Sequence, residues 1–174
     1  RKGNEKWKYT NARPIADVEY SPAQFEKIDL DYIKSIAPWH ESWINLLFVN
    51  GYYQETFSGN LSTNIKISNM ASSDLDANLS RTVGGIMDYS DDGFAALNTA
   101  FMSDGAIITV PEGENSEIVI NLIFFNQGLS DTVNHPRVLV TSGANSTVSV
   151  IENYVGGGGD RTFTNSVSEI YVGE

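Results

Sequence analysis

The sequence predicts a mainly β protein wound as a flattened solenoid, preceded by a smaller region of helices and strands. Five strand-like runs follow Gly105, separated by turns rich in Gly, Asn, Asp and Pro. The centres of every second run lie about thirty residues apart. This spacing is typical of a solenoid in which each coil contributes one strand to each of two facing sheets. The runs span residues 106–110, 117–125, 137–141, 147–154 and 163–172.

The second of these runs is apolar on both faces. From Ile118 to Phe125 only Asn121 is polar. Burial of both faces favours parallel pairing under a cover, whereas a β-sandwich, the alternative, prefers tight hairpins and strict alternation. One coil cannot bury such a face alone, so we expect the natural chain to continue past Glu174. A chain that stops at Glu174 is expected to self-associate through the unpaired strands of its last coil.

The first part of the chain, residues 1–104, is predicted to be an α+β region, and residues 105–174 the first coils of the solenoid. A helix is expected over residues 21–36, with Ser21 and Pro22 as N-cap and first helical residue. Its apolar residues fall three and four apart: Phe25, Ile28, Tyr32 and Ile36.

Three further elements are expected before residue 105. Strands at 46–49 and 52–57 flank Asn50-Gly51, a pair typical of a type I′ hairpin turn. Ile65 and Ile67 alternate with polar residues, as in a short strand. A helix of about three turns is predicted from roughly residue 92 to 102, with acids in its first turn and Phe94, Leu97 and Phe101 on one face.

Composition excludes several functions. The 174 residues include 22 Asp and Glu against 11 Lys and Arg, a net charge of -11 that repels nucleic acids and anionic membranes. There is no cysteine, so this stretch holds no disulfide and no thiolate nucleophile or ligand. The longest apolar run is too short to span a bilayer. We therefore expect neither nucleic-acid nor membrane partners.

Acid–base and metal chemistry have few candidates. His135 lies in the turn Asn134-His135-Pro136, where a polar residue that opens a strand is expected and a structural role is favoured. His40 lies between two tryptophans, where packing is favoured over catalysis. A calcium loop starting at Asp88 fails because Thr99 stands where a bidentate Glu is required, so helix capping explains these acids better. No catalytic, cofactor-binding or metal-binding residue is assigned.

Two motif-like patterns are also discounted. Gly156 to Gly159 lack the Lys-Ser/Thr of a phosphate-binding loop and are interpreted as a turn. Glu152 and Glu169 lie on strands two apart, where they could form the carboxylate pair of a glycosidase or lyase, but a solvated sheet face is favoured. A carbohydrate-active or adhesive solenoid remains the alternative function.

Several stretches, in their order, resemble the N-terminal half of the SufD family, subunits of the SufB-SufC-SufD iron–sulfur cluster assembly scaffold. The resemblance covers the chain from Glu5 to Glu174. It rests on Glu5-Lys6-Trp7-Lys8-Tyr9-Thr10-Asn11, Phe48-Val49-Asn50-Gly51-Tyr52-Tyr53, Gly93-Phe94-Ala95-Ala96-Leu97-Asn98-Thr99-Ala100-Phe101, Asp104-Gly105-Ala106-Ile107-Ile108-Thr109-Val110-Pro111, His135-Pro136-Arg137-Val138 and Phe163-Thr164-Asn165.

The resemblance implies a right-handed parallel β-helix after the N-terminal region. It also implies a non-enzymatic scaffold role in the cytoplasm, or in a plastid, with a SufB-type partner and the nucleotide-hydrolysing SufC, which binds a C-terminal helical region. The family's Cys and His implicated in cluster assembly lie late in the β-helix and match no position here. The cluster is therefore expected to be handled by the whole complex, with no cofactor in this stretch.

Overall fold

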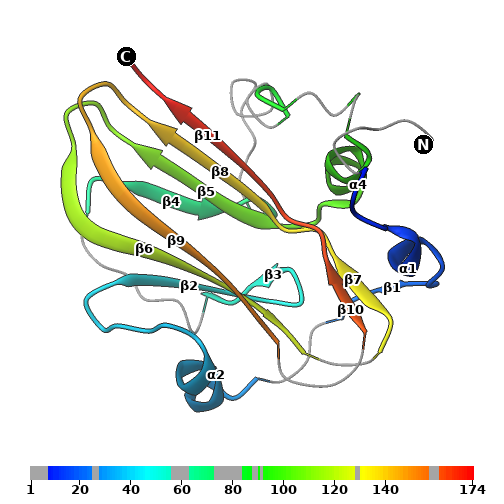
Figure 1. The fold of residues 1–174 in the computed structure, drawn as a ribbon. Helices are drawn as coiled ribbons and strands as arrows, with labels where there is room; N and C mark the ends of the chain where they lie inside the picture. The colour runs from blue at the N-terminus through cyan, green and yellow to red at the C-terminus, as the bar shows by residue number, and fades with distance from the viewer. Residues whose placement is uncertain are drawn as a thin grey trace.

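Three sheets make up most of the computed structural model, which describes residues 8–24, 28–55, 63–72, 84–87, 90, 92–127, 130–156 and 161–174. Two four-stranded sheets face each other, and a short three-stranded sheet lies at one side (Figure 1). The first contains β4 (Lys66–Asn69), β5 (Gly105–Val110), β8 (Arg137–Ser142) and β11 (Val167–Val172). The second contains β3 (Tyr52–Tyr53), β2 (Ile44–Val49), β6 (Asn115–Asn126) and β9 (Thr147–Gly156). The third contains β1 (Ser21–Pro22), β7 (Thr132–Asn134) and β10 (Thr162–Thr164).

The pairing within these sheets is mostly parallel. Gly105 pairs with Arg137 and Val110 with Ser142, so the offset between β5 and β8 is the same at both ends. β8 pairs with β11 at a similar constant offset, and β6 pairs with β9 in the same sense. The predicted parallel pairing of strands about thirty residues apart is therefore confirmed.

Antiparallel pairing joins only two pairs of the described strands. One is the predicted hairpin β2–β3, whose turn residues Asn50 and Gly51 have φ of 54° and 86°. Positive φ at both positions is what a type I′ turn requires, so the Asn-Gly prediction is confirmed. The other pair is β4 with β5, which places the predicted strand around Ile67 at the edge of the first sheet.

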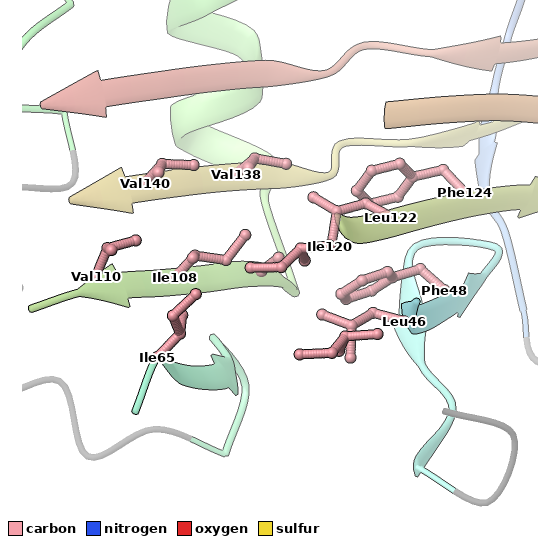
Figure 2. Packing of buried hydrophobic residues seen from close by; sticks show 12 residues of the cluster. Leu46, Phe48, Ile65, Ile108, Val110, Ile120, Leu122, Phe124, Val138 and Val140 are labelled. Atoms are coloured by element: carbon pink, nitrogen blue, oxygen red, sulfur yellow. The ribbon is translucent and has the colours of Figure 1, made fainter. Parts of the chain in front are cut away.

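The main core lies between the two four-stranded sheets. Figure 2 shows Ile108 of β5 and Val138 and Val140 of β8 pointing toward Leu122 and Phe124 of β6. Paired residues of parallel strands stack in rows, and the rings of Phe48 and Phe124 are 4.9 Å apart. Each fully buried side chain of this kind contributes about 1.5–3 kcal/mol to the free energy of folding.

The opposite face of β2 and β6 is also buried, as the two-faced apolar run predicts. Leu47, Ile123 and Phe125 pack there against Ile33 of helix α2 (Leu30–Ile36). The helix lies outside the second sheet (Figure 1), and it is the cover that parallel strands buried on both faces require.

The predicted helix over residues 21–36 is wrong in its first half. Ser21 and Pro22 form β1 and pair with β7, while the helix begins at Leu30 after its N-cap, Asp29. Asp29 accepts hydrogen bonds from the amides of Asp31 and Tyr32. Ile28 precedes the cap and is not helical, and Phe25 lies outside the described residues.

Helix α4 (Gly93–Phe101) confirms the second predicted helix. Asp92 caps it, accepting from the amides of Phe94 and Ala95. Its buried residues are Ala95 and Asn98, whereas Phe101 is 65% exposed, although the Phe94 and Phe101 rings still contact Phe163 and His135. A shorter helix, α1 (Arg13–Ala16), lies near the N-terminal end.

Two short strands differ from the prediction. The run 163–172 divides at Asn165 and Ser166 into β10 and β11, which belong to different sheets, and β7 was not predicted. Such short strands contain too few residues to show a period. The predicted domain boundary at residue 104 stays a prediction. Strands on its two sides pair with each other: β2 pairs with β6, and β4 pairs with β5.

Candidate functional site

Arg137 and Glu169 form a buried ion pair on the outer face of the first sheet. Their side chains are 0% and 1% exposed, and the Arg137 Nε donates to Glu169 Oε2 at 3.1 Å while Nη2 donates to the same oxygen. The glutamate also accepts from the amides of Gly84, at 2.8 Å, and of Ile86 and Met87. The pair therefore fixes the segment 84–87 against β8 and β11.

The charge state of Glu169 follows from these contacts. Burial raises the pKa of its carboxyl, but the Gly84 amide and the Arg137 guanidinium outweigh burial and hold the pKa below its usual value. Glu169 is thus an ionised structural group. The expectation that it lies on a solvated sheet face is wrong, because its residue is only 2% exposed.

Asparagine side chains connect α4 to the turns that precede β8 and β11. Asn98 donates to the carbonyls of Pro136 and Asn165 and accepts from Arg137 Nη1. Asn165 donates in turn to the Phe94 carbonyl. These contacts join α4 to the turns before β8 and β11, and they dock the helix on the outer face of the sheet.

His135 lies beside this network and is 8% exposed. Its Nδ1 is 3.2 Å from Asn165 Nδ2, and its ring lies between Phe101 and Phe163, with centroid distances of 5.9 and 6.4 Å. Burial lowers its pKa. The structural interpretation of His135 is supported, since the neighbours of its ring are the rings of Phe101 and Phe163 and the amide of Asn165.

His40 lies in a surface turn. Its Nδ1 is 2.7 Å from Ser42 Oγ and its ring is 5.7 Å from that of Trp43. The turn is tied to the sheet by Asn45 and Asn121, whose amides donate to the carbonyls of His40 and Pro38. The ring therefore packs against a tryptophan and a neighbouring hydroxyl, which supports the packing interpretation of His40 as well.

A row of three asparagines crosses the second sheet. Asn121 donates to Asn45 Oδ1 at 2.8 Å, and Asn153 donates to Asn121 Oδ1 at 2.6 Å. Asn45 and Asn121 are register partners on β2 and β6, whereas Asn121 pairs with Ile151 on β9 and is reached by Asn153 from two residues further along that strand. In the sequence Asn121 stood out only as an interruption of an apolar run, and the row was not predicted.

The end of the stack formed by β9 and β11 contains a hollow of about 370 Å³. Val148 and Val150 of β9 face Ile170 and Val172 of β11 across it, and Glu152 lies at its polar side. The Glu152 carboxylate accepts from the hydroxyls of Tyr154, at 2.6 Å, and of Ser168, at 2.8 Å.

The two candidate carboxylates do not form a pair. Glu152 is held on the interior face of β9, whereas Glu169 points away from that interior and binds Arg137. A glycosidase needs both carboxyl groups beside one substrate bond. The arrangement therefore supports no hydrolytic centre at these residues.

The described residues contain neither a cluster of metal ligands nor a membrane-spanning helix. No group of three or more His, Asp or Glu that could hold a metal ion occurs within the described ranges. Asp88 and Asp91 of the tested calcium loop and Gly157–Gly159 of the glycine run lie outside those ranges. In the part of the chain that the structure covers, no helix has the length and apolarity to cross a bilayer.

The fold and these contacts define a class: a mainly β protein whose sheets pair mostly in parallel, with a few helices, and whose buried polar residues hold the elements together. The family model of the SufBD protein N-terminal region matches residues 1–122. The chain belongs to this SufBD family.

A curated relative matches almost the whole chain. It is an iron–sulfur cluster assembly SufBD family protein of Synechocystis sp., 26% identical over 187 aligned residues. The alignment covers 99% of this chain and 41% of the relative. The chain therefore spans about two fifths of the length of this relative.

Proposed function

We propose that this chain is part of a non-enzymatic scaffold subunit that takes part in iron–sulfur cluster assembly. The observation that carries the proposal is the family match over residues 1–122, which includes the hairpin, α4 and β5. The Synechocystis relative, an iron–sulfur cluster assembly SufBD family protein, supports the same process. The cluster is cargo of the assembly, and no residue of this chain is assigned to bind it.

A structural role agrees with how the polar groups are used. Arg137, Glu169, Asn98 and Asn165 use their hydrogen bonds to hold α4 and neighbouring segments to the sheet. A nucleophile within hydrogen-bond reach of a base, oriented by a third group, is the usual sign of covalent catalysis. His135 contacts an asparagine in buried surroundings instead, and His40 contacts the Ser42 hydroxyl in an exposed turn, where no residue is proposed as the orienting third group.

Within the SufBD family we further propose a SufD-type subunit whose coils continue as a right-handed parallel β-helix. The constant offsets between β5 and β8 and between β8 and β11 support repeated coils, and right-handed crossovers are the rule for parallel strands. The proposed partners are a SufB-type subunit and the nucleotide-hydrolysing SufC-type subunit, in the cytoplasm.

Affinity purification from the source organism tests the partners. A tag on the chromosomal copy of the full protein should retain SufB-type and SufC-type subunits, identified by mass spectrometry, and its deletion should lower the activity of iron–sulfur enzymes. The variant His40→Gln should restore these activities fully, because no chemical role is proposed for this exposed residue. Unchanged enzyme activities after deletion, or a purification without either subunit, would contradict the proposal.

A further inference from the structure

The end of the stack that the first coil forms carries the strands β1, β3 and β4. Each is the outermost strand of its sheet, on the side opposite β10, β9 and β11. β1 and β3 have two residues each, and Pro22 of β1 has no N–H group to donate. β4 has four residues, of which Lys66 is exposed. Short strands, proline and lysine are means by which proteins protect sheet edges from pairing with other chains.

The strands just inside this end are longer and apolar. Every residue of β2 is buried, as is every residue of β5 except Thr109. β3 pairs with β2 and β4 pairs with β5, both in the antiparallel sense. If β3 or β4 were released, the buried strand behind it would offer backbone N–H and C=O groups to a strand of another chain.

Asp104, which immediately precedes β5, connects β3 to β4. The residue is 4% exposed, and its Oδ2 accepts from the Tyr53 amide of β3 at 2.9 Å. Its Oδ1 accepts from the amide of Ala71, just after β4, at 3.0 Å and from the amide of Gly105 at 2.8 Å. The side chain of Asn69, in β4, donates to the same carboxylate at 3.2 Å. One carboxylate therefore holds both outermost strands at the start of β5.

Asn50 connects the β2–β3 turn to the third of these strands. It is 3% exposed, and its Nδ2 donates to the carbonyl of Gln24, two residues after β1. Its Oδ1 accepts from the amide of Gln127, just after β6, at 2.8 Å. The strands β1, β3 and β4 belong to three different sheets, yet buried polar side chains join them into one unit.

We propose that β1, β3 and β4 form a cap, held in place by Asp104, that closes this end of the stack to strands of other chains. Terminal repeats with a polar outer face serve this purpose in solenoid proteins. Coils that follow Glu174 would stack on β9, β10 and β11, at the opposite end, and would leave the cap as it is. The proposal is independent of the role in iron–sulfur cluster assembly.

Hydrogen exchange of the full-length protein, measured by mass spectrometry, tests the role of Asp104. Asp104→Ala removes the acceptor shared by the two strands, so amides of β3 and β4 should exchange about tenfold or more faster, while those of β6 and β8 keep their protection. Asp29→Ala is the matched control, because this carboxylate also accepts from two backbone amides but caps α2. It should leave exchange in β3 and β4 unchanged.

A milder variant covers the case in which Asp104→Ala does not fold. Asp104→Asn keeps one acceptor oxygen and replaces the other with an NH2 group. Because Oδ2 serves β3 and Oδ1 serves the residue after β4, either placement of the NH2 group opposes a donor N–H. Exchange should therefore rise in β3 or in β4, and not in both to the extent expected of Asp104→Ala.

A disulfide between β4 and β5 distinguishes edge protection from a general loss of stability. Lys66 and Thr109 are paired across these strands, and the 174 residues contain no cysteine. Lys66→Cys with Thr109→Cys, added to Asp104→Ala or Asp104→Asn, can therefore close a bridge that fastens β4. In light scattering at equal concentrations, the reduced protein should associate more than Asp29→Ala, and oxidation should abolish the difference. Mass spectrometry of the linked peptides verifies the bridge.

The proposal fails on any of three outcomes. Unchanged exchange in β3 and β4 of the folded Asp104 variants would show that this carboxylate does not hold them. An equal rise in β6 and β8 would show a general loss of stability instead of a local opening. Association that is the same in the reduced and oxidised forms would show that the edge of β5 is not what the cap protects.

Discussion

Arg137 shows how one residue organises the outer face of the first sheet. It lies at the start of β8, is fully buried, and contacts Glu169 of β11 and Asn98 and Thr99 of α4. A buried charge is tolerated only when it is paired and hydrogen-bonded. Arg137 thereby connects two strands and a helix that are far apart in sequence.

Removing the arginine should therefore be costly. Arg137→Met leaves Glu169 ionised and buried without its cation, and we expect a loss of about 3–5 kcal/mol in the free energy of unfolding, measured by urea denaturation. Arg13→Met is the matched control, because its pair with Asp17 is exposed on both sides and should cost about 0–1 kcal/mol. Equal losses for the two variants would contradict this assignment.

His135 predicts a pH dependence. In the folded chain, burial lowers the pKa of its imidazole below the ordinary 6.5 of the unfolded chain. At pH values between the folded and the unfolded pKa, the unfolded chain therefore binds more protons than the folded one. The free energy of unfolding should therefore fall as pH drops below about 6.5. His135→Gln should remove this slope and His40→Gln should keep it, in urea titrations at several pH values. A slope unchanged in His135→Gln would exclude His135 as its source.

Single-residue features could be predicted from the sequence where their cause was local. The Asp92 cap and the Asn50-Gly51 turn were predictable because each depends on neighbouring residues. The Arg137–Glu169 pair was missed because its partners are brought together by the coil offset, and a charged residue in a sequence gives no sign of burial.

At the scale of elements, the spacing between strands depends on small residues. β5 approaches β8 most closely at Gly105, where an added Cβ would lie 1.8 Å from the Arg137 carbonyl oxygen. α4 begins at Gly93, where an added Cβ meets no atom within 4 Å. Gly105 therefore allows two strands to approach closely, whereas the surroundings of Gly93 leave room for a side chain.

Alanine substitutions separate these cases. Gly105→Ala forces β5 and β8 apart and should lower the free energy of unfolding by about 3 kcal/mol. Gly93→Ala should leave it unchanged or raise it by up to about 1 kcal/mol, because alanine favours the helix. Thermal or urea unfolding of both variants provides the comparison. A Gly105→Ala protein as stable as Gly93→Ala would contradict the observed approach of the strands.

The predicted helix over residues 21–36 differs from the observed elements because its first residues pair with a distant strand. The period of Phe25, Ile28, Tyr32 and Ile36 suggested one long helix, but among the described residues of this stretch only those after the Asp29 cap, which form α2, are helical. Ser21 and Pro22 instead pair with β7, a contact between distant parts of the sequence that no local pattern encodes. Tertiary pairing thus overrode the local helical period.

For the whole molecule, the repeat of the strands was the most informative feature of the sequence. Long strands such as β6 and β9 carry enough apolar residues to show the offset, and the predicted facing sheets are observed. The third sheet, made of very short strands, was not foreseen. The assignment to the SufBD family agrees with this architecture and with the resemblance stated from the motifs.

The central claim is that successive coils stack with parallel strands. Nuclear Overhauser effects between backbone protons of the isotope-labelled 19.1 kDa chain test it most directly. Stacked parallel coils predict contacts between β5 and β8 in which the difference of the two residue numbers stays constant, from Gly105–Arg137 to Val110–Ser142. Contacts in which the sum of the two residue numbers stays constant would show antiparallel pairing and contradict it.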